Sequence, residues 1–420
     1  MNLPVSGRVV LIDDKFKEAL PLIRVLSQER IAVTFFSGRI EELPSEPFQD
    51  VRIIFMDMVL DGLDGADDKT IISTLMGVVK KIVSPESGPF ILAVWTKHPE
   101  KVEKVQNALR EEGFYLIQIN LEKEYFFKMS EDGKEWLFDE NKFDDLKKKL
   151  KEKTQEIEIF ETFIIWENLI HDSASETVNE VSRFSEYNDA WNDEIKKIFY
   201  NLSKAWAGRR EDDVAVKDSF YSFHQIFNDI LERKTQSIET ADVVFEEGEL
   251  SNEVKGKINF RILADTSTYE KVYPGIVYKV HSLESSFMSD ILNENDDKRL
   301  NLIIRGSIPV LIEVSPVCDF VQNKMRMSRM IKGVLLPDSV ENYNSVWRKI
   351  KKSASFLYVS PVIYYGNSVF RMVLDFRYFT SEPLSNQERE TIFRIRKDIL
   401  NDIQTRLAFH VNRTGVLFLE

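Results

Sequence analysis

The chain has 420 residues, of which 43% are hydrophobic and 30% are charged, and its formal net charge is −13. This length predicts two or three domains with sizeable cores, and the composition argues against extensive disorder and against general wrapping of nucleic acid. The single cysteine excludes an intramolecular disulfide and a cysteine-rich zinc site, as is typical of a reducing cytoplasm. We find no signal peptide and no apolar run of the ~20 residues that a membrane span needs, so we expect a cytoplasmic protein.

The first third of the chain alternates between predicted strands and predicted helices. Five apolar, β-branched runs predict strands at residues 8–12, 31–36, 51–57, 90–96 and 114–119. The segments between them predict helices at about residues 15–29, 40–43, 67–83 and 98–112. This alternation predicts an α/β fold with a doubly wound, five-stranded parallel sheet that is covered by helices on both faces.

Polar residues follow four of these predicted strands. Asp13 and Asp14 come directly after the first strand, and Asp57 ends the third. Because the carboxyl ends of parallel strands meet at one edge of a sheet, we expect the three carboxylates to converge and to bind a hard divalent cation such as Mg²⁺. Thr96 ends the fourth strand, and Lys123 follows shortly after the fifth, so both fit the same edge.

This pattern resembles the receiver domain of bacterial two-component response regulators, over roughly residues 6–125. The resemblance implies that Asp13 and Asp14 are metal carboxylates and that Asp57 binds the metal and accepts a phosphoryl group. It also implies that Thr96 is the switch hydroxyl and that the amine of Lys123 pairs with the phosphoryl group. The alternative is a degenerate receiver, which keeps the fold without the chemistry.

Residues 126–238 predict a helical middle region that follows a receiver-like domain at residues 1–125. Apolar residues recur at helical spacing over residues 143–171, 174–207 and 213–234, and the stripes are wide enough to pack a helical bundle. We interpret these side chains as core rather than as a cofactor site, and we leave a homodimer open. The stripe residues are Val178, Val181, Phe184, Trp191, Ile195, Ile198, Leu202, Phe220, Phe223, Phe227 and Ile230.

Residues 239–420 predict a strand-rich α+β output domain. Runs punctuated by Gly and Pro predict strands at residues 257–263, 275–280, 301–305, 309–314, 355–359 and 370–375. A stripe of isoleucines predicts a closing helix at about residues 386–409.

A Ser-Pro-Val-Cys-Asp corner at residues 315–319 follows one of these predicted strands. Corners between a strand and a helix often form sites, so the corner and one other strand end supply the candidate output site. We expect Cys318 to be buried and Asp319 to cap the next helix, because no histidine lies at a diagnostic spacing for a catalytic cysteine. A nucleophilic Cys318 is the alternative. The candidate output-site residues are Glu313, Cys318, Asp319, Lys324, Asp375 and Arg377.

Residues 323–353 are locally basic, with eight Lys and Arg side chains against Asp338 and Glu341. In an acidic chain this excess predicts contact with the phosphates of nucleic acid, or docking to an acidic partner. The alternative is a set of solvated helix faces. The candidate phosphate-binding residues are Arg348, Lys349, Lys351 and Lys352.

The layout as a whole, with its Ser-Pro-x-Cys-Asp corner, is similar to receiver-like proteins of bacterial defence or stress operons that lie beside histidine-kinase-like ATPases. This resemblance implies a signalling protein whose partner is a histidine-kinase-like protein or ATPase. Phosphorylation or metal occupancy at Asp57 would then control an output domain without a helix-turn-helix. The alternative is a receiver-gated effector enzyme, such as a nuclease or toxin, that acts on nucleic acid.

Overall fold

The computed structural model describes residues 8–58, 60, 63, 65–96, 99–131, 133–155, 158–207, 216–238, 247–266, 273–282, 284–292, 297–321, 324–338, 356–384 and 389–412. The chain divides into two compact units, residues 1–196 with 220–245 and residues 197–219 with 246–420. Across the described ranges, no helix combines the length and the apolar character needed to cross a membrane. The predicted boundary near residue 239 lies outside the described residues.

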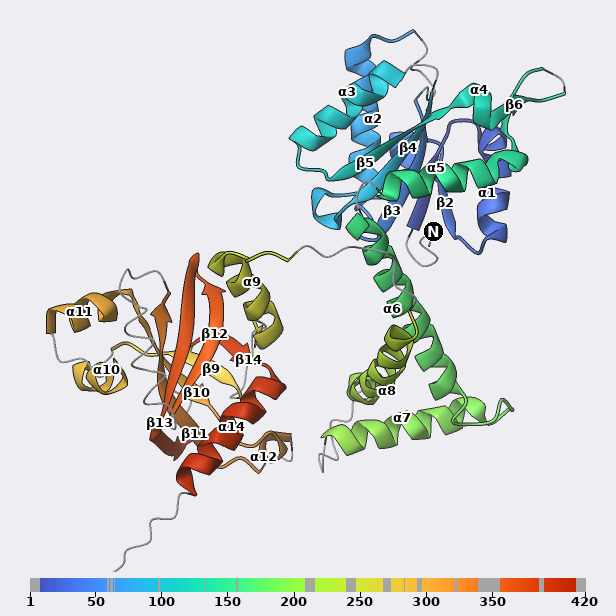
Figure 1. Cartoon of the computed structure of the whole chain (residues 1–420). Helices are drawn as coiled ribbons and strands as arrows, with labels where there is room; N and C mark the ends of the chain where they lie inside the picture. Colours follow the sequence, from blue (N-terminus) through green and yellow to red (C-terminus); the bar gives the residue numbers. More distant parts are fainter. Residues whose placement is uncertain are drawn as a thin grey trace, which may run out of the picture. The chain divides into compact units, whose positions relative to one another are not determined.

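The first unit is built on a five-stranded parallel sheet with the strand order β2-β1-β3-β4-β5 (Figure 1). The predicted doubly wound sheet is confirmed, and each predicted strand starts within two residues of the observed one. The strands are β1 (Arg8–Ile12), β2 (Val33–Phe36), β3 (Val51–Asp57), β4 (Phe90–Thr96) and β5 (Leu116–Glu122). The helices between them are α1 (Phe16–Gln28), the 3-10 turn η1 (Ile40–Glu42), α2 (Asp68–Ile82), the 3-10 turn η2 (Pro85–Ser87) and α3 (Pro99–Glu111).

The strands separate two apolar cores, one on each face of the sheet. Successive strand residues point to opposite faces, so Phe55 of β3 lies in one core and Met56 in the other. The first core includes buried side chains of α1 and the second includes buried side chains of α2 and α3. Both cores hold the sheet in place, and the carboxyl ends of its strands form a single edge.

Side chains from the segment after β5 are buried in the first core. A short helix α4 (Lys123–Phe126) leads into the hairpin β6 (Phe127–Met129) and β7 (Trp136–Phe138), then the 3-10 turn η3 (Glu140–Lys142) and helix α5 (Phe143–Gln155). Phe127, Phe138 and Leu146 from these elements are all buried in the first core. These elements are therefore part of the packed first unit.

Three long helices follow: α6 (Glu158–Ser182), α7 (Trp191–Ala207) and α8 (Val216–Gln236). The helical prediction for this region is confirmed, although α6 starts at Glu158 and continues through residues 171–174, where we expected one helix to end and the next to begin. The prediction that the apolar stripes form a core is largely wrong. Of the stripe residues, only Val181 and Ile230 are buried.

The second unit contains a seven-stranded antiparallel sheet, curved like a half-barrel, with the order β12-β13-β11-β10-β9-β14-β8. Helices α9 and α14 pack on one face of this sheet, and α10 and α11 pack on the other. The strand-rich α+β prediction is confirmed. The strands are β8 (Ala264–Asp265), β9 (Ile276–Lys279), β10 (Ile308–Glu313), β11 (Met327–Pro337), β12 (Leu357–Tyr365), β13 (Ser368–Pro383) and β14 (Glu390–Ile395). The helices are α9 (Asn252–Leu263), α10 (Ser285–Leu292), α11 (Asp297–Gly306), α12 (Val317–Val321) and α14 (Lys397–Val411).

Two of the predicted strands are helices. Residues 257–263 belong to α9, which starts at a Ser251 cap that accepts a hydrogen bond from the Val254 N–H at 3.2 Å. Gly256 then lets α9 lie directly on β12, since an added Cβ would stand 3.1 Å from the backbone nitrogen of Tyr364. Residues 301–305 belong to α11, where Leu300 and Ile303 are buried at helical spacing.

The closing helix is also shorter than predicted. Residues 390–395 form β14, which pairs with β9, and α14 begins only at Lys397. Phe393 and Ile395 are buried in the sheet's core, and their alternation is a strand pattern that the isoleucine stripe of α14 obscured. Strand β11 was not predicted, because its basic residues at positions 329 and 332 suggested a solvated helix.

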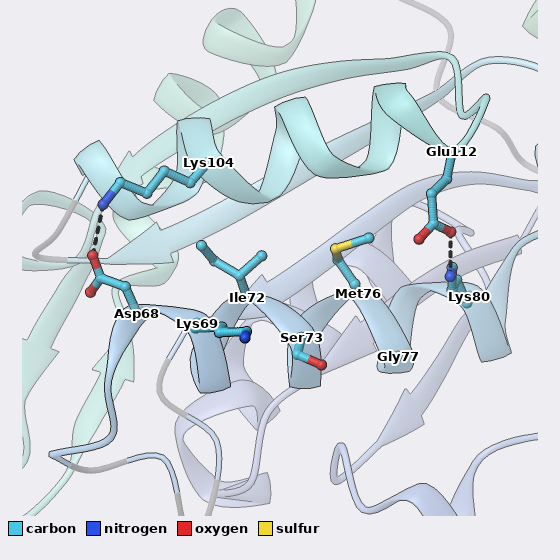
Figure 2. Close-up of a pocket in the computed structure, with 9 residues that line it drawn as sticks. All are labelled: Asp68, Lys69, Ile72, Ser73, Met76, Gly77, Lys80, Lys104 and Glu112. Atoms are coloured by element: carbon cyan, nitrogen blue, oxygen red, sulfur yellow. Dashed lines mark hydrogen bonds and ion pairs between the residues drawn. The ribbon is translucent and has the colours of Figure 1, made fainter.

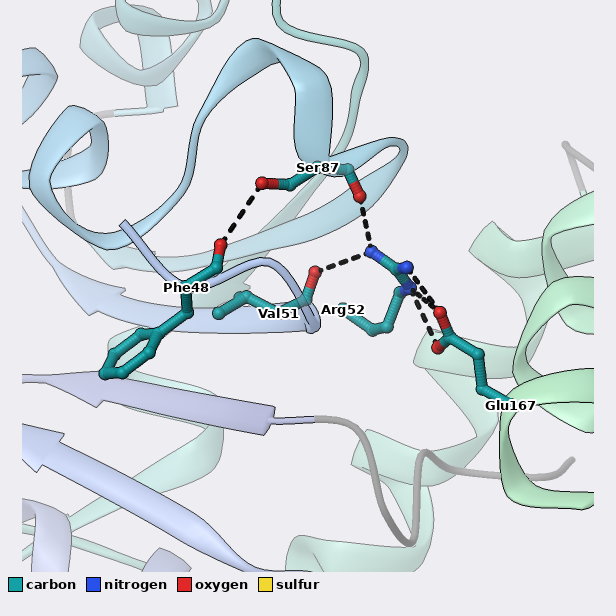
Figure 3. Close-up of polar contacts among 5 residues, drawn as sticks. All are labelled: Phe48, Val51, Arg52, Ser87 and Glu167. Carbon is teal, nitrogen blue, oxygen red and sulfur yellow. Dashed lines mark hydrogen bonds and ion pairs between the residues drawn. The ribbon is translucent and has the colours of Figure 1, made fainter. Parts of the chain in front are cut away.

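A nearly buried ion pair fastens α6 to the five-stranded sheet. Arg52, near the start of β3, donates hydrogen bonds to both carboxylate oxygens of Glu167 (Figure 3). Its Nε lies 3.1 Å from Oε1 and 2.9 Å from Oε2, and its Nη2 also donates to Oε1. Its Nη1 donates to the carbonyl oxygens of Ser87 at 2.8 Å and Val51 at 3.1 Å. Only 12% of the Arg52 side chain and 29% of the Glu167 side chain are exposed, so solvent screens this pair weakly.

Removing the carboxylate of this pair should destabilise the first unit. We expect Glu167→Ala to lower the free energy of unfolding by about 2 kcal/mol, because Arg52 would keep its buried position without its charged acceptor. Glu180→Ala is the matched control, since Glu180 is an exposed glutamate on the same helix and its loss should cost less than about 0.5 kcal/mol. Equal denaturant midpoints for the two variants would show that the pair contributes nothing.

Candidate metal centre

Three aspartates meet at the carboxyl edge of the five-stranded sheet. Asp13 and Asp14 directly follow β1, and Asp57 is the last residue of β3. The two strands are parallel neighbours in which Ile12 stands opposite Met56, so the residues that follow them emerge side by side. The adjacency that the sequence predicted is therefore observed.

Backbone contacts continue the sheet past the end of β1 and hold the first carboxylate. The N–H of Asp13 donates to the carbonyl oxygen of Phe36 in β2 at 3.1 Å. The side chain of Asp13 then accepts the backbone N–H of Lys15 at 2.8 Å through Oδ1. Both contacts orient Asp13 before any ligand binds, which lowers the entropic cost of binding one.

The carboxylates are close enough to share one ligand. Each of Asp13, Asp14 and Asp57 offers an oxygen, and these oxygens all lie within 4.8 Å of one another. Asp13 and Asp57 are buried, and Asp14 is half-buried. Two unit charges at that distance repel by about 3 kcal/mol at an effective dielectric constant of about 20, so a cation at this edge would offset a substantial unfavourable energy.

A glycine follows β2 at the edge of the sheet that carries the aspartates. Gly38, just after β2, has a φ of +84°, and an added Cβ would stand 2.7 Å from a methyl carbon of Leu60 and 3.4 Å from one of Ile12. The Leu60 side chain, which follows β3, therefore lies close to the backbone at position 38, and the positive φ there favours glycine. The strand pattern alone does not single out this residue, and the usable signal is a glycine two residues after a predicted strand.

The donor set fits a hard divalent cation. Carboxylate oxygens are the ligands that such cations prefer, and soft or imidazole-preferring metals would call for Cys or His instead. Among the described residues, these three aspartates are the only group of three or more Asp, Glu, His or Cys side chains close enough to hold a metal ion. The described part of the chain thus has one candidate metal centre.

The backbone places Thr96 and Lys123 on the same edge. Thr96 ends β4, the neighbour of β3, and Lys123 follows β5, in which Glu122 stands opposite Thr96. Neighbouring strands lie about 4.8 Å apart, so Thr96 is one strand and Lys123 two strands from the strand of Asp57. The side chains of these two residues lie outside the described ones, so their predicted roles remain predictions.

In the second unit, Glu313 lies just before the Ser-Pro-Val-Cys-Asp corner. It is fully buried at the end of β10, and its carboxylate accepts hydrogen bonds from Ser315 Oγ at 2.5 Å, Ser315 N at 3.0 Å, Arg329 N at 2.9 Å and Ser328 Oγ at 3.3 Å. Burial raises the pKa of Glu313 above its usual range, and these hydrogen bonds oppose that rise. The carboxylate thereby ties the corner to β11.

The expectations for Cys318 and Asp319 are wrong. Cys318 is exposed rather than buried, and its Sγ lies 3.8 Å from Oδ1 of Asp319. Asp319 lies inside α12 rather than before it, so it does not cap that helix. Its carbonyl oxygen accepts the N–H of Lys324 at 2.7 Å, and Lys324 is exposed. The short helix starts three residues earlier than expected, because Val317 directly follows the Ser-Pro turn.

The two remaining candidate output-site residues, Asp375 and Arg377, bind each other. Asp375 on β13 is fully buried, and its carboxylate accepts Nε of Arg377 at 3.0 Å and Nη2 at 2.6 Å. The guanidinium of Arg377 also lies 3.9 Å from the ring centre of Phe356. These contacts account for both side chains structurally, and a catalytic role for them remains a prediction.

The basic stretch is described only in part. Arg348, Lys349, Lys351 and Lys352 lie outside the described residues. In the described half, Arg329 and Lys332 lie on β11, and Lys332 pairs with Glu284 at 3.3 Å and lies over the ring of Phe287. The prediction that this stretch binds phosphates therefore remains a prediction.

A shallow groove lies between α2 and α3, on the face of the sheet that carries the second core (Figure 2). An ion pair closes each end, Lys104 with Asp68 at 2.7 Å and Lys80 with Glu112. Its lining does not include the three aspartates of the metal centre. The groove and the metal centre are therefore separate features of the first unit.

Comparisons with known proteins do not indicate a function for this chain. No family model matches the chain, and no curated protein matches it. A solved structure titled "The crystal structure of adenylate cyclase from Rhodopirellula baltica" is 21% identical over 27% of this chain and 75% of that chain, with a TM-score of 0.18. A TM-score this low carries no argument about the fold or the activity.

Cation binding at the three aspartates should stabilise the folded protein. We expect Mg²⁺ at ten times its dissociation constant to raise the free energy of unfolding of the wild type by about 1.4 kcal/mol, because the unfolded chain lacks the assembled site. Asp13→Asn should lose most of this gain, whereas Asp189→Asn, which alters an exposed aspartate outside the site, should keep it. Thermal melts with chelator and with Mg²⁺ measure the difference. A gain of the same size in Asp13→Asn would place the bound cation elsewhere.

Proposed function

We propose that the first unit is a receiver domain and that the chain is a signalling protein in which Asp57 accepts a phosphoryl group. The convergence of Asp13, Asp14 and Asp57 within 4.8 Å at one sheet edge carries this proposal. The strand order supports it further, because β4, which ends at Thr96, and β5, which is followed by Lys123, are the next strands along the sheet from β3.

In this proposal Mg²⁺ is the cation, held by the three aspartates, and it supplies positive charge that offsets the negative charge of the phosphoryl oxygens. Asp13 and Asp14 belong to the chain that leaves β1, so they can hold the cation while Asp57 keeps an oxygen for reaction. Buried surroundings strengthen these electrostatic interactions relative to the same charges in water.

The chemistry assigned to Asp57 is a simple displacement. A carboxylate oxygen of Asp57 attacks the phosphorus of a phosphorylated donor, and the bond between phosphorus and the donor's leaving atom breaks as that atom takes the electron pair. The amine of Lys123 would pair with the phosphoryl oxygens, and the hydroxyl of Thr96 would donate to one of them. Water later cleaves the acyl phosphate, which restores the Asp57 carboxylate and releases inorganic phosphate.

The strand that ends in Asp57 also supports a route for the signal. Arg52 on the same strand binds Glu167 of α6, so a displacement of β3 would also displace α6. The proposed output is a change in the helices and in the second unit, and the proposed phosphoryl donor is a histidine-kinase-like protein or ATPase. The effector-enzyme alternative remains a prediction that no observation in the described residues favours.

Acetyl phosphate should add one acid-labile phosphoryl group to the wild-type protein in the presence of Mg²⁺. Asp57→Ala should take up none, because it lacks the attacking oxygen, while Asp189→Asn should match the wild type. Intact-protein mass spectrometry after brief incubation measures the adduct. No adduct on the wild type would support a degenerate receiver, and an equal adduct on Asp57→Ala would show that the acceptor lies elsewhere.

A further inference from the structure

A buried glutamate lies in the first turn of α1, shortly after the aspartates of the metal centre. Glu18 is only 2% exposed, although carboxylates are rarely buried unless they are paired. It is one helical turn from Leu22, which is buried in the first core, so both side chains share one face of α1. The three aspartates alone do not explain why the chain buries a further acid so close to them in the sequence.

Lys15 joins Glu18 to the metal centre. The backbone N–H of Lys15 donates to Oδ1 of Asp13 at 2.8 Å, and its carbonyl oxygen accepts the N–H of Glu18 at 2.9 Å. The side-chain Nζ of Lys15 lies 3.5 Å from Oε1 of Glu18. One residue therefore contacts a metal-centre carboxylate through its backbone and the buried glutamate through both its backbone and its side chain.

Lys15 is an unusual residue for the start of a helix. It is the N-cap of α1, where Ser, Thr, Asp and Asn are preferred, and its side chain makes no capping hydrogen bond. A positive charge is also unfavourable at a helix N-terminus, whereas an acid in the first turn is favourable. Glu18 supplies that acid and offsets the charge of Lys15. The pair thereby stabilises the turn whose N–H binds Asp13.

The second lysine after the aspartates also pairs with a glutamate. Nζ of Lys17 lies 3.4 Å from Oε1 of Glu135, which precedes β7. The two pairs differ in burial, because the Glu135 side chain is 34% exposed and the Glu18 side chain is 2% exposed. Solvent therefore screens the charge of Glu18 less than that of Glu135.

The amine of Lys15 is a natural competitor for the cation. Lysine carries a positive charge on a long, flexible side chain, and Lys15 directly follows Asp14 in the chain. A positive charge 4 Å from a carboxylate is attracted by about 4 kcal/mol at an effective dielectric constant of about 20. An ammonium group bound to the aspartates would occupy the same oxygens that Mg²⁺ needs. Pairing with Glu18 gives this amine another acceptor.

We propose that Glu18 is a positioning residue of the metal centre, which keeps the amine of Lys15 from competing for the aspartate oxygens and fixes the turn that binds Asp13. Glu18 is not one of the carboxylates whose oxygens lie within 4.8 Å of one another, so it acts through Lys15 rather than as a ligand. The inference rests on the proposed function only in that the three aspartates bind Mg²⁺. Phosphoryl transfer has no part in it.

Calorimetric titration of the full chain with Mg²⁺ tests the proposal. Glu18→Gln keeps the shape of the side chain and removes its charge, and it should raise the dissociation constant for Mg²⁺ roughly tenfold, as the loss of a residue that orients a metal ligand typically does. Glu41→Gln is the matched control, since Glu41 is an exposed glutamate of η1 in the same unit, and it should bind Mg²⁺ like the wild type.

A second background separates this role from a simple effect of charge. Lys15→Met keeps the backbone N–H that binds Asp13 and removes the amine, so it should bind Mg²⁺ more tightly than the wild type. In this background Glu18→Gln should change the dissociation constant less than about twofold, because no amine remains to be released. The same fold-change in both backgrounds would overturn the proposal, since Glu18 would then act only as a distant charge.

Melting curves in chelator show whether Glu18 matters only for the fold. A lower melting temperature for Glu18→Gln with an unchanged dissociation constant for Mg²⁺ would overturn the proposal. Because the Lys15 side chain is 61% exposed, Lys15→Met tests the proposal even where Glu18→Gln does not fold, and binding no tighter than the wild type would overturn it. A wild type that binds no Mg²⁺ would overturn the metal centre as well. Binding of Mg²⁺ without any phosphoryl adduct would contradict the receiver chemistry alone.

Discussion

The close approach of three carboxylates at one sheet edge is the constraint on which the rest of the first unit depends. Oxygen atoms of Asp13, Asp14 and Asp57 lie within 4.8 Å of one another because β1 and β3 are parallel neighbours that end at the same level. Such a cluster carries an electrostatic cost, which the two cores on either face of the sheet must offset. A bound cation lowers that cost, and this is why occupancy of the site and stability of the fold should be linked.

The second feature is the continuity between this sheet and α6. The N-terminal half of α6 is part of the sheet's own core through Phe160 and Ile164, and Arg52 binds Glu167 near the start of the strand that ends in Asp57. The helix therefore cannot move independently of β3 without breaking a weakly screened ion pair.

The sequence was most informative where burial is complete on both faces. The central strands β1, β3 and β4 contain continuous buried apolar runs at residues 9–12, 53–56 and 90–95, so their positions and the polar residues at their ends could be predicted closely. The same reasoning failed at residues 257–263, where a strand-like alternation is overridden by the Ser251 cap and by close packing at Gly256. It also failed at Phe220 and Phe223, because apolar spacing predicts a helix face but does not say whether the same chain covers it. Long-range contacts such as Arg52 with Glu167 leave no local signal in the sequence.

The central claim is that one site both binds the cation and accepts the phosphoryl group. The most direct test measures phosphoryl incorporation from acetyl phosphate as a function of free Mg²⁺ concentration, beside the Mg²⁺-dependent rise in melting temperature of the same protein. The account predicts that both curves rise together, that chelator abolishes incorporation, and that Asp13→Asn shifts both curves to higher Mg²⁺. Incorporation at Asp57 that is unchanged by chelator, or that persists unshifted in Asp13→Asn, would contradict it.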